Sequence, residues 1–535
     1  MTPHPFLLVL LASVLIPTAP AHAQKKIRLG PEQKVAGWGY SIRILEDWQA
    51  IAIKPEEKFT VGHWKLNTDQ LRLRGLYKEY EAGSYCDLQI IRIATQVLTG
   101  KTKTPEEIER EKAEEEQIKR FPDLVRRLRP KSFDDWLAGA FKDCDKRWVR
   151  TPLKTKDLEG ELIEFGSGAE AYTIALFKRD GVEWGVVYTS FEEANSIYRD
   201  WYLKSIDTFE LFEADSTDAA AMARKDPNKL KGEEKRAALH ASIAASPGWY
   251  AIDTDHYVFL SNSDNRKFIQ QIAKEIEVVR AKVYTKLFPP RNKEQALSPV
   301  RVCDTESEYY QYGGPRGSAG YFSPDSGELV LFTKFEDVTS TNSLNYCRSV
   351  MYHEAFHQYI HYAVGDVSPH SWFNEGHGDF FAGMKVRGSS IKFDTFDWRV
   401  DYLKQHLREK RDLIPLRTLI RLPQSEYYTN AGLKYSEGWA LIYYLRNVTR
   451  RKSEQKILDI YFNYLADHVE AFRAKKKEKG KDDGEKVPGI PGIEVIDWED
   501  AKKVQEILSA AVDKAFDGID IDKLEKDFLR WVERL

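Results

Sequence analysis

Residues 350–361 have the sequence Val-Met-Tyr-His-Glu-Ala-Phe-His-Gln-Tyr-Ile-His, and the predicted fold is organised around them. His353 and His357 are four residues apart, so on a helix both imidazoles project from one face and can bind a single metal ion. Glu354 is turned by about 100° from His353, so it flanks the metal rather than binding it. A carboxylate in that position can take a proton from water that zinc has made more acidic. The pentapeptide is the His-Glu-x-x-His pattern of zinc helices.

A second helix is predicted from Trp372 to Phe381, with Ser371 as its N-terminal cap. Glu375 and Asp379 are four residues apart in it and therefore share a face. Glu375 would be the third ligand and complete the His₂Glu set of a catalytic zinc, which leaves a fourth position open to water. Asp379 would accept the free ring N–H of a ligand histidine and fix its tautomer.

The first helix is predicted over about residues 344–364, and Gly365 ends it. Its apolar side chains form one stripe to the side of the histidine face, which leaves the histidines free to point into a cleft. The stripe is predicted to be buried, and it consists of Tyr352, Phe356, Tyr359, Ile360 and Ala363.

The first motif, followed by Trp372-Phe373-Asn374-Glu375-Gly376 and then Asp379, resembles the gluzincin metallopeptidases. These have the thermolysin-type arrangement, and the chain is most similar to the peptidase-MA-like group of secreted bacterial proteins. The resemblance is specific over Pro369–Ala382 and the first helix, and diffuse over residues 247–535. It implies one zinc per chain, with roles for five residues: His353, His357 and Glu375 as ligands, Glu354 as general base, and Asp379 as the support of a ligand histidine.

Other histidines compete less well for the metal. A metzincin is disfavoured because the third histidine of that family would fall at Ala363. His361 is a competing ligand, but it lies two turns from His353, too far along the helix axis to close the same site easily. His377 points away from Glu375 on the second helix and is predicted to be structural.

The resemblance also implies a donor to the oxyanion that develops during the reaction. In related gluzincins, a tyrosine on a helix downstream of the third ligand has this role. Tyr435 occupies a similar place in this sequence. Tyr427, Tyr428 and His406 are rivals, and plain core packing of Tyr435 is the other alternative.

Residues 1–23 are predicted to be a secretory signal. The apolar run Phe6–Leu11 precedes the small-x-small sequence Ala21-His22-Ala23, and cleavage is expected after Ala23. We therefore expect a secreted or periplasmic protein. No later stretch is apolar enough for a transmembrane segment. The net charge of −3 provides no basic field for nucleic acid, so the expected partner is a peptide or protein substrate.

The fold class is predicted to be α+β, with an N-terminal α+β domain at residues 24–213, a helical linker at 214–246 and a gluzincin-like domain at 247–535. An antiparallel sheet with helices is predicted for the N-terminal domain. This domain is faintly similar to PsbP-like domains in its opening strands and its closing Ser205–Phe209. Its strands are expected within residues 37–53, 87–97, 171–178, 182–189 and 205–212, and its helices at 104–129 and 192–202.

The gluzincin-like domain is expected to contain a small mixed sheet before the zinc helix and a mostly helical C-terminal part. The strand at Leu329–Phe332 is either an edge to which an extended peptide can add or an ordinary core strand. The expected segments are strands at 257–260, 300–302 and 328–332, helices at 264–287, 498–516 and 521–535, and a charged loop at 473–492.

The chain has four cysteines, which allow three pairings in an exported protein. Pairing within each half would join Cys86 to Cys144 and Cys303 to Cys347. The alternative is four buried thiols, because a large core does not need disulfides.

Together these features predict a secreted zinc metallopeptidase. One alternative is a binding or scaffold protein that keeps the peptidase fold but cleaves nothing, although the intact ligands and Glu354 argue against it. The other is a zinc hydrolase of a different amide, such as a cell-wall crosslink.

Overall fold

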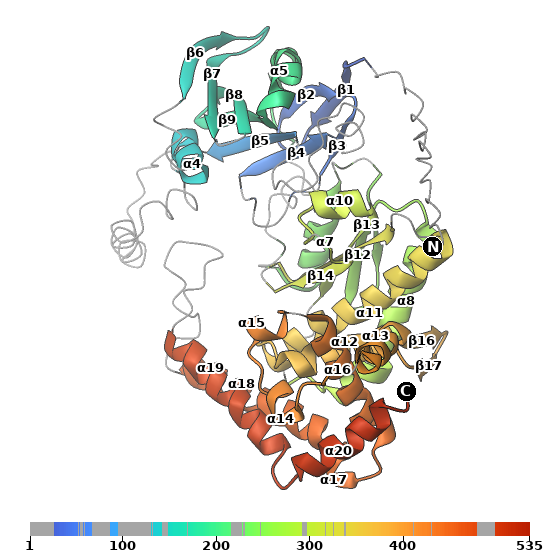
Figure 1. Cartoon of the computed structure of the whole chain (residues 1–535). Coiled ribbons are helices and arrows are strands. Elements are labelled where there is room, and N and C mark those ends of the chain that lie inside the picture. The colour runs from blue at the N-terminus through green and yellow to red at the C-terminus, as the bar shows by residue number, and fades with distance from the viewer. Residues whose placement is uncertain are drawn as a thin grey trace, which may run out of the picture.

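The computed structural model describes residues 26–535 with several gaps, the longest of which are 67–85, 95–129, 142–147, 216–226 and 479–497. The predicted signal segment and the predicted helix at 104–129 lie outside the described residues. Helices and strands both occur and form several sheets, so the predicted α+β class is confirmed. Figure 1 shows the N-terminal sheets at one end of the molecule and the helical C-terminal part at the other. In the described part of the chain, no helix is long and apolar enough to cross a membrane.

The N-terminal part is built on a seven-stranded antiparallel sheet with the order β3-β4-β5-β9-β8-β7-β6. Alternate residues of a strand face opposite sides, so Ala175 and Phe177 pack under α5 while Ile174 and Leu176 pack under α4. Both faces of the sheet are therefore covered. The strands are β3 (Trp48–Ala50), β4 (Thr60–Leu66), β5 (Asp87–Ala94), β6 (Val149–Lys154), β7 (Glu159–Ser167), β8 (Glu170–Arg179) and β9 (Val182–Phe191), and the helices are α4 (Phe133–Ala140) and α5 (Glu192–Ile206).

A smaller sheet, β1-β2-β10, closes the N-terminal unit beside α5. Its strands are β1 (Leu29–Val35), β2 (Tyr40–Leu45) and β10 (Glu210–Leu211). The sequence predicted strands at β2, β3, β5, β8, β9 and β10, whereas β1, β4, β6, β7 and α4 were missed.

The second sheet is mixed, as predicted, and has the order β11-β12-β13-β15-β14. β12, β13 and β15 run parallel, and β11 and β14 are antiparallel to their neighbours. The strand predicted at Leu329–Phe332 is interior, because β15 lies between β13 and β14, and β14 forms the edge on this side of the sheet. The strands are β11 (Tyr250–Asp253), β12 (Tyr257–Ser261), β13 (Ser298–Thr305), β14 (Gly320–Ser323) and β15 (Glu328–Lys334).

Helices cover both faces of this mixed sheet. On one face, α8 (Arg266–Val279) and α11 (Ser340–Val364) pack on the apolar side chains of β12, β13 and β15. On the other face lie α7 (Gly232–Ile243) and α10 (Glu306–Gln311). Within the predicted helical linker at 214–246, α7 packs on β12.

The helix with the metal-binding motif, α11, is fixed to the sheet by its own side chains. The Gln358 side-chain amide donates to Pro299 O at 3.0 Å and to Gly327 O at 2.9 Å, at the starts of β13 and β15. The stripe from Tyr352 to Ala363 is buried as predicted. Gly365 ends the helix with φ 92°, a left-handed conformation that glycine adopts readily.

The rest of the chain is mostly helical and joins the core of α8 and α11. Ser371 does not cap α12, because the N-cap residue is His370, which makes no side-chain cap. Residues 473–478, predicted as loop, continue α18. The elements are α12 (Ser371–Ala382), β16 (Met384–Arg387), β17 (Ser390–Phe393), α13 (Asp397–Arg408), α14 (Leu416–Leu419), α15 (Gln424–Tyr427), α16 (Ala431–Tyr443), α17 (Lys452–Gln455), α18 (Ile457–Glu478), α19 (Trp498–Ala515) and α20 (Ile521–Val532), with α9 (Thr285–Leu287) after α8 and π-helical turns at Arg280–Tyr284 and Tyr444–Val448.

Three of the four cysteines are buried free thiols: Cys86, Cys303 and Cys347. The pairings Cys303–Cys347 and Cys86–Cys144 are therefore absent, and Cys144 itself lies outside the described residues. Burial raises the pKa of Cys86 and of Cys347 to about 12, so both are protonated and unreactive at neutral pH.

We expect the Cys86, Cys303 and Cys347 thiols to resist a water-soluble thiol reagent in the native protein and to react rapidly in denaturant. In the native protein, burial keeps the reagent away and disfavours the reactive thiolate form. Mass spectrometry of peptides from native and denatured samples would measure this. A disulfide that links any of the three in an unreduced digest would contradict the expectation.

Candidate metal centre

Three potential ligand side chains converge where α11 and α12 cross. Glu375 Oε2 on α12 lies 3.2 Å from His353 Nε2 and 3.3 Å from His357 Nε2, both on α11. One donor atom from each residue lies within 4.8 Å of the others. No other group of three such residues was found in the part of the chain that the structure describes. Two imidazoles and a carboxylate are a donor set that suits a divalent metal such as zinc.

Two glycines let α12 come this close to its neighbours. A Cβ at Gly378 would lie 2.8–2.9 Å from atoms of the His353 ring, and a Cβ at Gly376 would lie 2.6 Å from Gly438 O on α16. Real Cβ atoms do not approach other atoms so closely. The two glycines of the run Glu375-Gly376-His377-Gly378 therefore let α12 pack closely between α11 and α16, which brings Glu375 to the two histidines.

The second nitrogen of each ligand imidazole has an oxygen acceptor. His353 Nδ1 lies 3.1 Å from Asp379 Oδ1, as predicted, and His357 Nδ1 lies 2.9 Å from Asn374 Oδ1. These contacts fix both ring orientations and leave the two Nε2 atoms for a metal. The role of Asn374 was not predicted, although its amide directly precedes Glu375 in the quoted motif.

Arg399 on α13 supports Asp379 and was also not predicted. Its Nε donates to Asp379 Oδ2 at 2.6 Å and its Nη2 to Oδ1 at 3.3 Å. The guanidinium lies 4.9 Å from the ring centroid of Trp398 and 5.0 Å from that of Tyr435. A buried carboxylate needs such a partner, and Arg399 provides it for Asp379.

Opposite charges hold the three ligand side chains together. Burial alone would lower the pKa of His353, but Asp379 and Glu375 raise it well above its usual value. Burial would raise the pKa of Glu375, but His357 and His353 hold it well below the usual range. The imidazole protons thus balance the carboxylate where a divalent cation could do so, and binding of a metal would release them.

Glu354 flanks the ligand group without joining it, as predicted. The Phe322 backbone on edge strand β14 is near its carboxylate and opposes a rise in its pKa. Burial raises its pKa, although the neighbouring imidazoles of His353 and His357 oppose that shift. A carboxylate with a raised pKa beside a metal site is suited to accept and return a proton.

Two of the four candidates for oxyanion donor face the ligands. The Tyr428 hydroxyl donates to Glu375 Oε1 at 2.6 Å. The Tyr435 ring stacks over the His353 ring, with centroids 6.4 Å apart and planes 10° apart. The other two are engaged elsewhere: the Tyr427 hydroxyl donates to Lys434 O at 2.7 Å, and His406 Nε2 lies 3.1 Å from Asp412 O.

The two other histidines of α11 and α12, His361 and His377, lie outside the ligand group. His361 Nε2 lies 3.3 Å from Asp366 Oδ1 near the end of α11. His377 is buried, and its Nδ1 lies 2.8 Å from Phe373 O while Arg446 Nη2 lies 2.9 Å from its Nε2. His377 is therefore structural, as predicted.

No family model and no curated protein matches the chain. Among solved structures it is similar to the solution structure of cyanobacterial PsbP (CyanoP) from Synechocystis sp. PCC 6803, with 8% sequence identity, a TM-score of 0.20, and coverage of 34% of this chain and 92% of that chain. A likeness this weak supports no conclusion, and the PsbP-like character of the N-terminal unit stays a prediction.

The close approach at Gly378 predicts that Gly378→Ala will weaken binding of an added divalent metal ion by about 10- to 100-fold, the effect typical of a displaced ligand support. The added methyl group would push the His353 ring away from Glu375. The control is Gly166→Ala in β7, where a Cβ would meet only Glu170 O at 3.7 Å. Isothermal titration of metal-free protein would measure both affinities. Equal affinities in the two variants would show that α12 can move without disturbing the site.

Proposed function

We propose that this protein is a secreted or periplasmic zinc metallopeptidase that hydrolyses peptide bonds. The observation that carries the proposal is the convergence of His353, His357 and Glu375, with the Glu354 carboxylate beside them under an edge strand. His353 and His357 would hold the zinc through Nε2 and Glu375 through a carboxylate oxygen. A bound zinc supplies a Lewis acid that polarises the scissile carbonyl and makes water more acidic.

The chain's own groups then move the protons. Glu354 takes a proton from the attacking water and returns it to the leaving amine. Its burial supports this role, because a raised pKa makes the carboxylate a better proton acceptor. Asp379 and Asn374 hold the ligand rings in place throughout.

Tyr435 is the favoured donor to the oxyanion. Burial and the nearby Glu375 carboxylate raise the pKa of its hydroxyl, so the hydroxyl stays protonated and able to donate. Tyr428 already donates to Glu375 and orients that ligand. Arg399, stacked on the Tyr435 ring, limits the movement of Tyr435.

The edge strand β14 supports a polypeptide as the substrate class. An edge strand has backbone N–H and C=O groups on one side that can pair with an extended peptide. β14 passes directly over Glu354, since a Cβ at Gly320 would lie 3.3 Å from Glu354 Cγ. This arrangement favours a polypeptide substrate over a cell-wall amide, and the intact Glu354 favours an enzyme over a scaffold.

We expect purified protein to contain about one zinc per chain, bound through His353, His357 and Glu375. His357→Ala or Glu375→Ala should strip the metal, because two remaining ligands cannot hold it. His361→Ala, one turn further along α11, is the matched control and should retain it. Elemental analysis after gel filtration would measure zinc content. Full zinc retention in both ligand variants would refute the assignment.

Glu354→Gln should lower turnover by about 10²–10⁴-fold with zinc retained, because the variant loses its proton acceptor. Tyr435→Phe should cost about 10²–10³-fold, and Tyr428→Phe less. A peptide library with and without chelator provides substrates for the assay. Wild-type protein with bound zinc but no chelator-sensitive cleavage would favour the scaffold alternative, and equal activity of wild type and Glu354→Gln would exclude Glu354 as the base.

A further inference from the structure

The N-terminal unit is seated on the mixed sheet through residues that do not belong to its own core. Ile51, directly after β3, is buried in a cluster with residues of β13, β15 and α10. The Lys65 ammonium on β4 donates to Gln311 O, the last residue of α10, at 3.1 Å. Figure 1 shows β3 and β4 lying directly above α10. The cluster consists of Ile51, Cys303, Tyr309, Tyr312, Val330 and Phe332.

This contact lies at the carboxyl ends of the parallel strands. The connection after β12 leads to α8 on one face, and the connection after β13 leads to α10 on the other. A crevice between such diverging connections is where open α/β sheets bind ligands. A small cavity there is lined by Gln49, Ala50 and Ile51 of the N-terminal unit, together with Asn262, Cys303 and Glu308.

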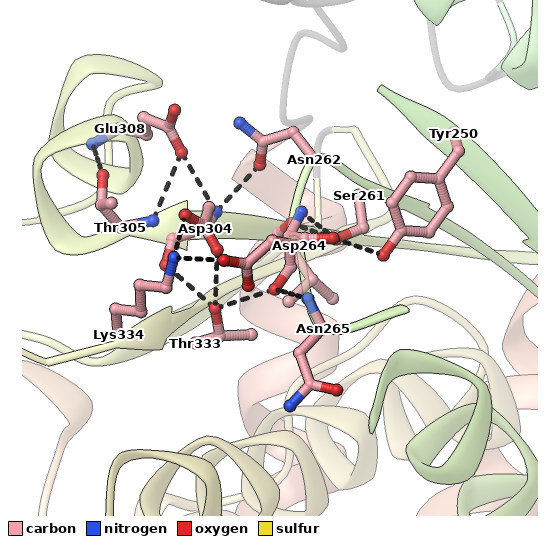
Figure 2. Close-up of polar contacts among 12 residues, drawn as sticks. Tyr250, Ser261, Asn262, Asp264, Asn265, Asp304, Thr305, Glu308, Thr333 and Lys334 are labelled. Atoms are coloured by element: carbon pink, nitrogen blue, oxygen red, sulfur yellow. Dashed lines mark hydrogen bonds and ion pairs between the residues drawn. The ribbon is translucent and has the colours of Figure 1, made fainter. Parts of the chain in front are cut away.

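Figure 2 shows that the polar groups around this crevice pair with one another. The Lys334 ammonium contacts Asp304 Oδ2 at 2.6 Å and Asp264 Oδ2 at 3.1 Å. The Asp304 backbone N–H donates to Asn262 Oδ1 at 2.9 Å and to Glu308 Oε2 at 3.1 Å. The N-terminal unit thus packs at the position where other open α/β sheets bind a ligand. We call this contact the seat of the N-terminal unit.

Tyr309 connects this seat to the edge strand. Its ring is fully buried and lies 5.0 Å from the Phe332 ring and 5.9 Å from that of Tyr321 on β14. Its hydroxyl is 2.5 Å from Ser318 Oγ, in the segment that leads into β14. A Cβ at Gly314 would lie 2.3 Å from the Tyr309 ring, so that segment lies flat against it.

The edge strand in turn meets the candidate general base. A Cβ at Gly320 would lie 3.3 Å from Glu354 Cγ and 2.6 Å from Val350 Cγ1, one turn before Glu354 on the same face of α11. A shift of β14 would therefore move both the peptide-binding edge and the surroundings of Glu354.

We propose that the N-terminal unit fixes the position of β14, the strand to which a peptide substrate would add. The unit's residues Ile51 and Lys65 pack against the α10 region and so fix the position of Tyr309. Tyr309 in turn fixes the position of β14 relative to Glu354. Ile51 and Tyr309 are positioning residues in this proposal, since each acts through β14. The proposal rests on the proposed function in one respect, namely that a peptide adds to β14.

The test uses the full chain with Ile51→Asn and Lys65→Met. We expect faster amide hydrogen exchange in residues 317–323 and a KM raised by about 2- to 30-fold, the usual range of coupling through packed residues, with zinc content unchanged and kcat altered less than KM. Ile51→Val should restore both values. The control is Ile197→Asn, which alters an exposed isoleucine on α5 of the same unit.

Exchange in β5 and β9 would report whether the N-terminal unit remains folded, and Lys65→Met decides the test if Ile51→Asn unfolds it. Unchanged exchange in β14, whatever happens to KM, would overturn the proposal. If the wild-type protein cleaves no peptide, the proposed function fails, but faster exchange in β14 alone would still support the positioning role.

Discussion

The distance at which α12 passes α11 is the constraint on which the rest of the structure depends. Glu375 can lie between two imidazoles only because Gly378 presents no side chain to the His353 ring. On its other side α12 meets α16 in the same way, through Gly376 and Gly438. The position of one helix is thus set from two directions, and Tyr435 on α16 is placed over His353 as a result.

A fourth helix, α13, joins this arrangement because it neutralises a buried charge. Burial of Asp379 would be costly without a positive partner, and Arg399 on α13 provides one. The same guanidinium lies against the Tyr435 ring, so charge and packing join α11, α12, α13 and α16 around one point. On the sheet side, Gln358 anchors α11 to two backbone carbonyls. The ligand-bearing face therefore has little freedom to move in either direction.

The sequence could predict what depends on local periodicity. Spacing by one helical turn placed His353 with His357 and Glu375 with Asp379, and the apolar stripe of α11 followed from the same rule. The role of Arg399 could not be predicted from the sequence. The hairpin β16–β17 and the start of α13 bring Arg399 to Asp379, and no spacing rule describes that path. The role of Asn374 could have been predicted, since a side-chain amide next to a ligand residue can accept a hydrogen bond from a ligand imidazole N–H.

Other misses arose from tertiary structure. Whether Leu329–Phe332 is an edge or a core strand is decided by where the short strand β14 pairs, and four residues carry too little periodicity to predict it. The thiols are a similar case: spacing allowed pairing, but Cys303 and Cys347 ended up buried and free.

The shortness of β14 has a consequence for self-association. An exposed sheet edge is a template for any extended chain, including another copy of the same protein, and long, flat edges lead to aggregation. β14 offers only four residues of edge, Gly320–Ser323, which is too little for stable sheet extension between folded molecules. A flexible polypeptide could use this edge only if other contacts held it in place. A second folded copy of the protein therefore meets little backbone here on which to extend the sheet.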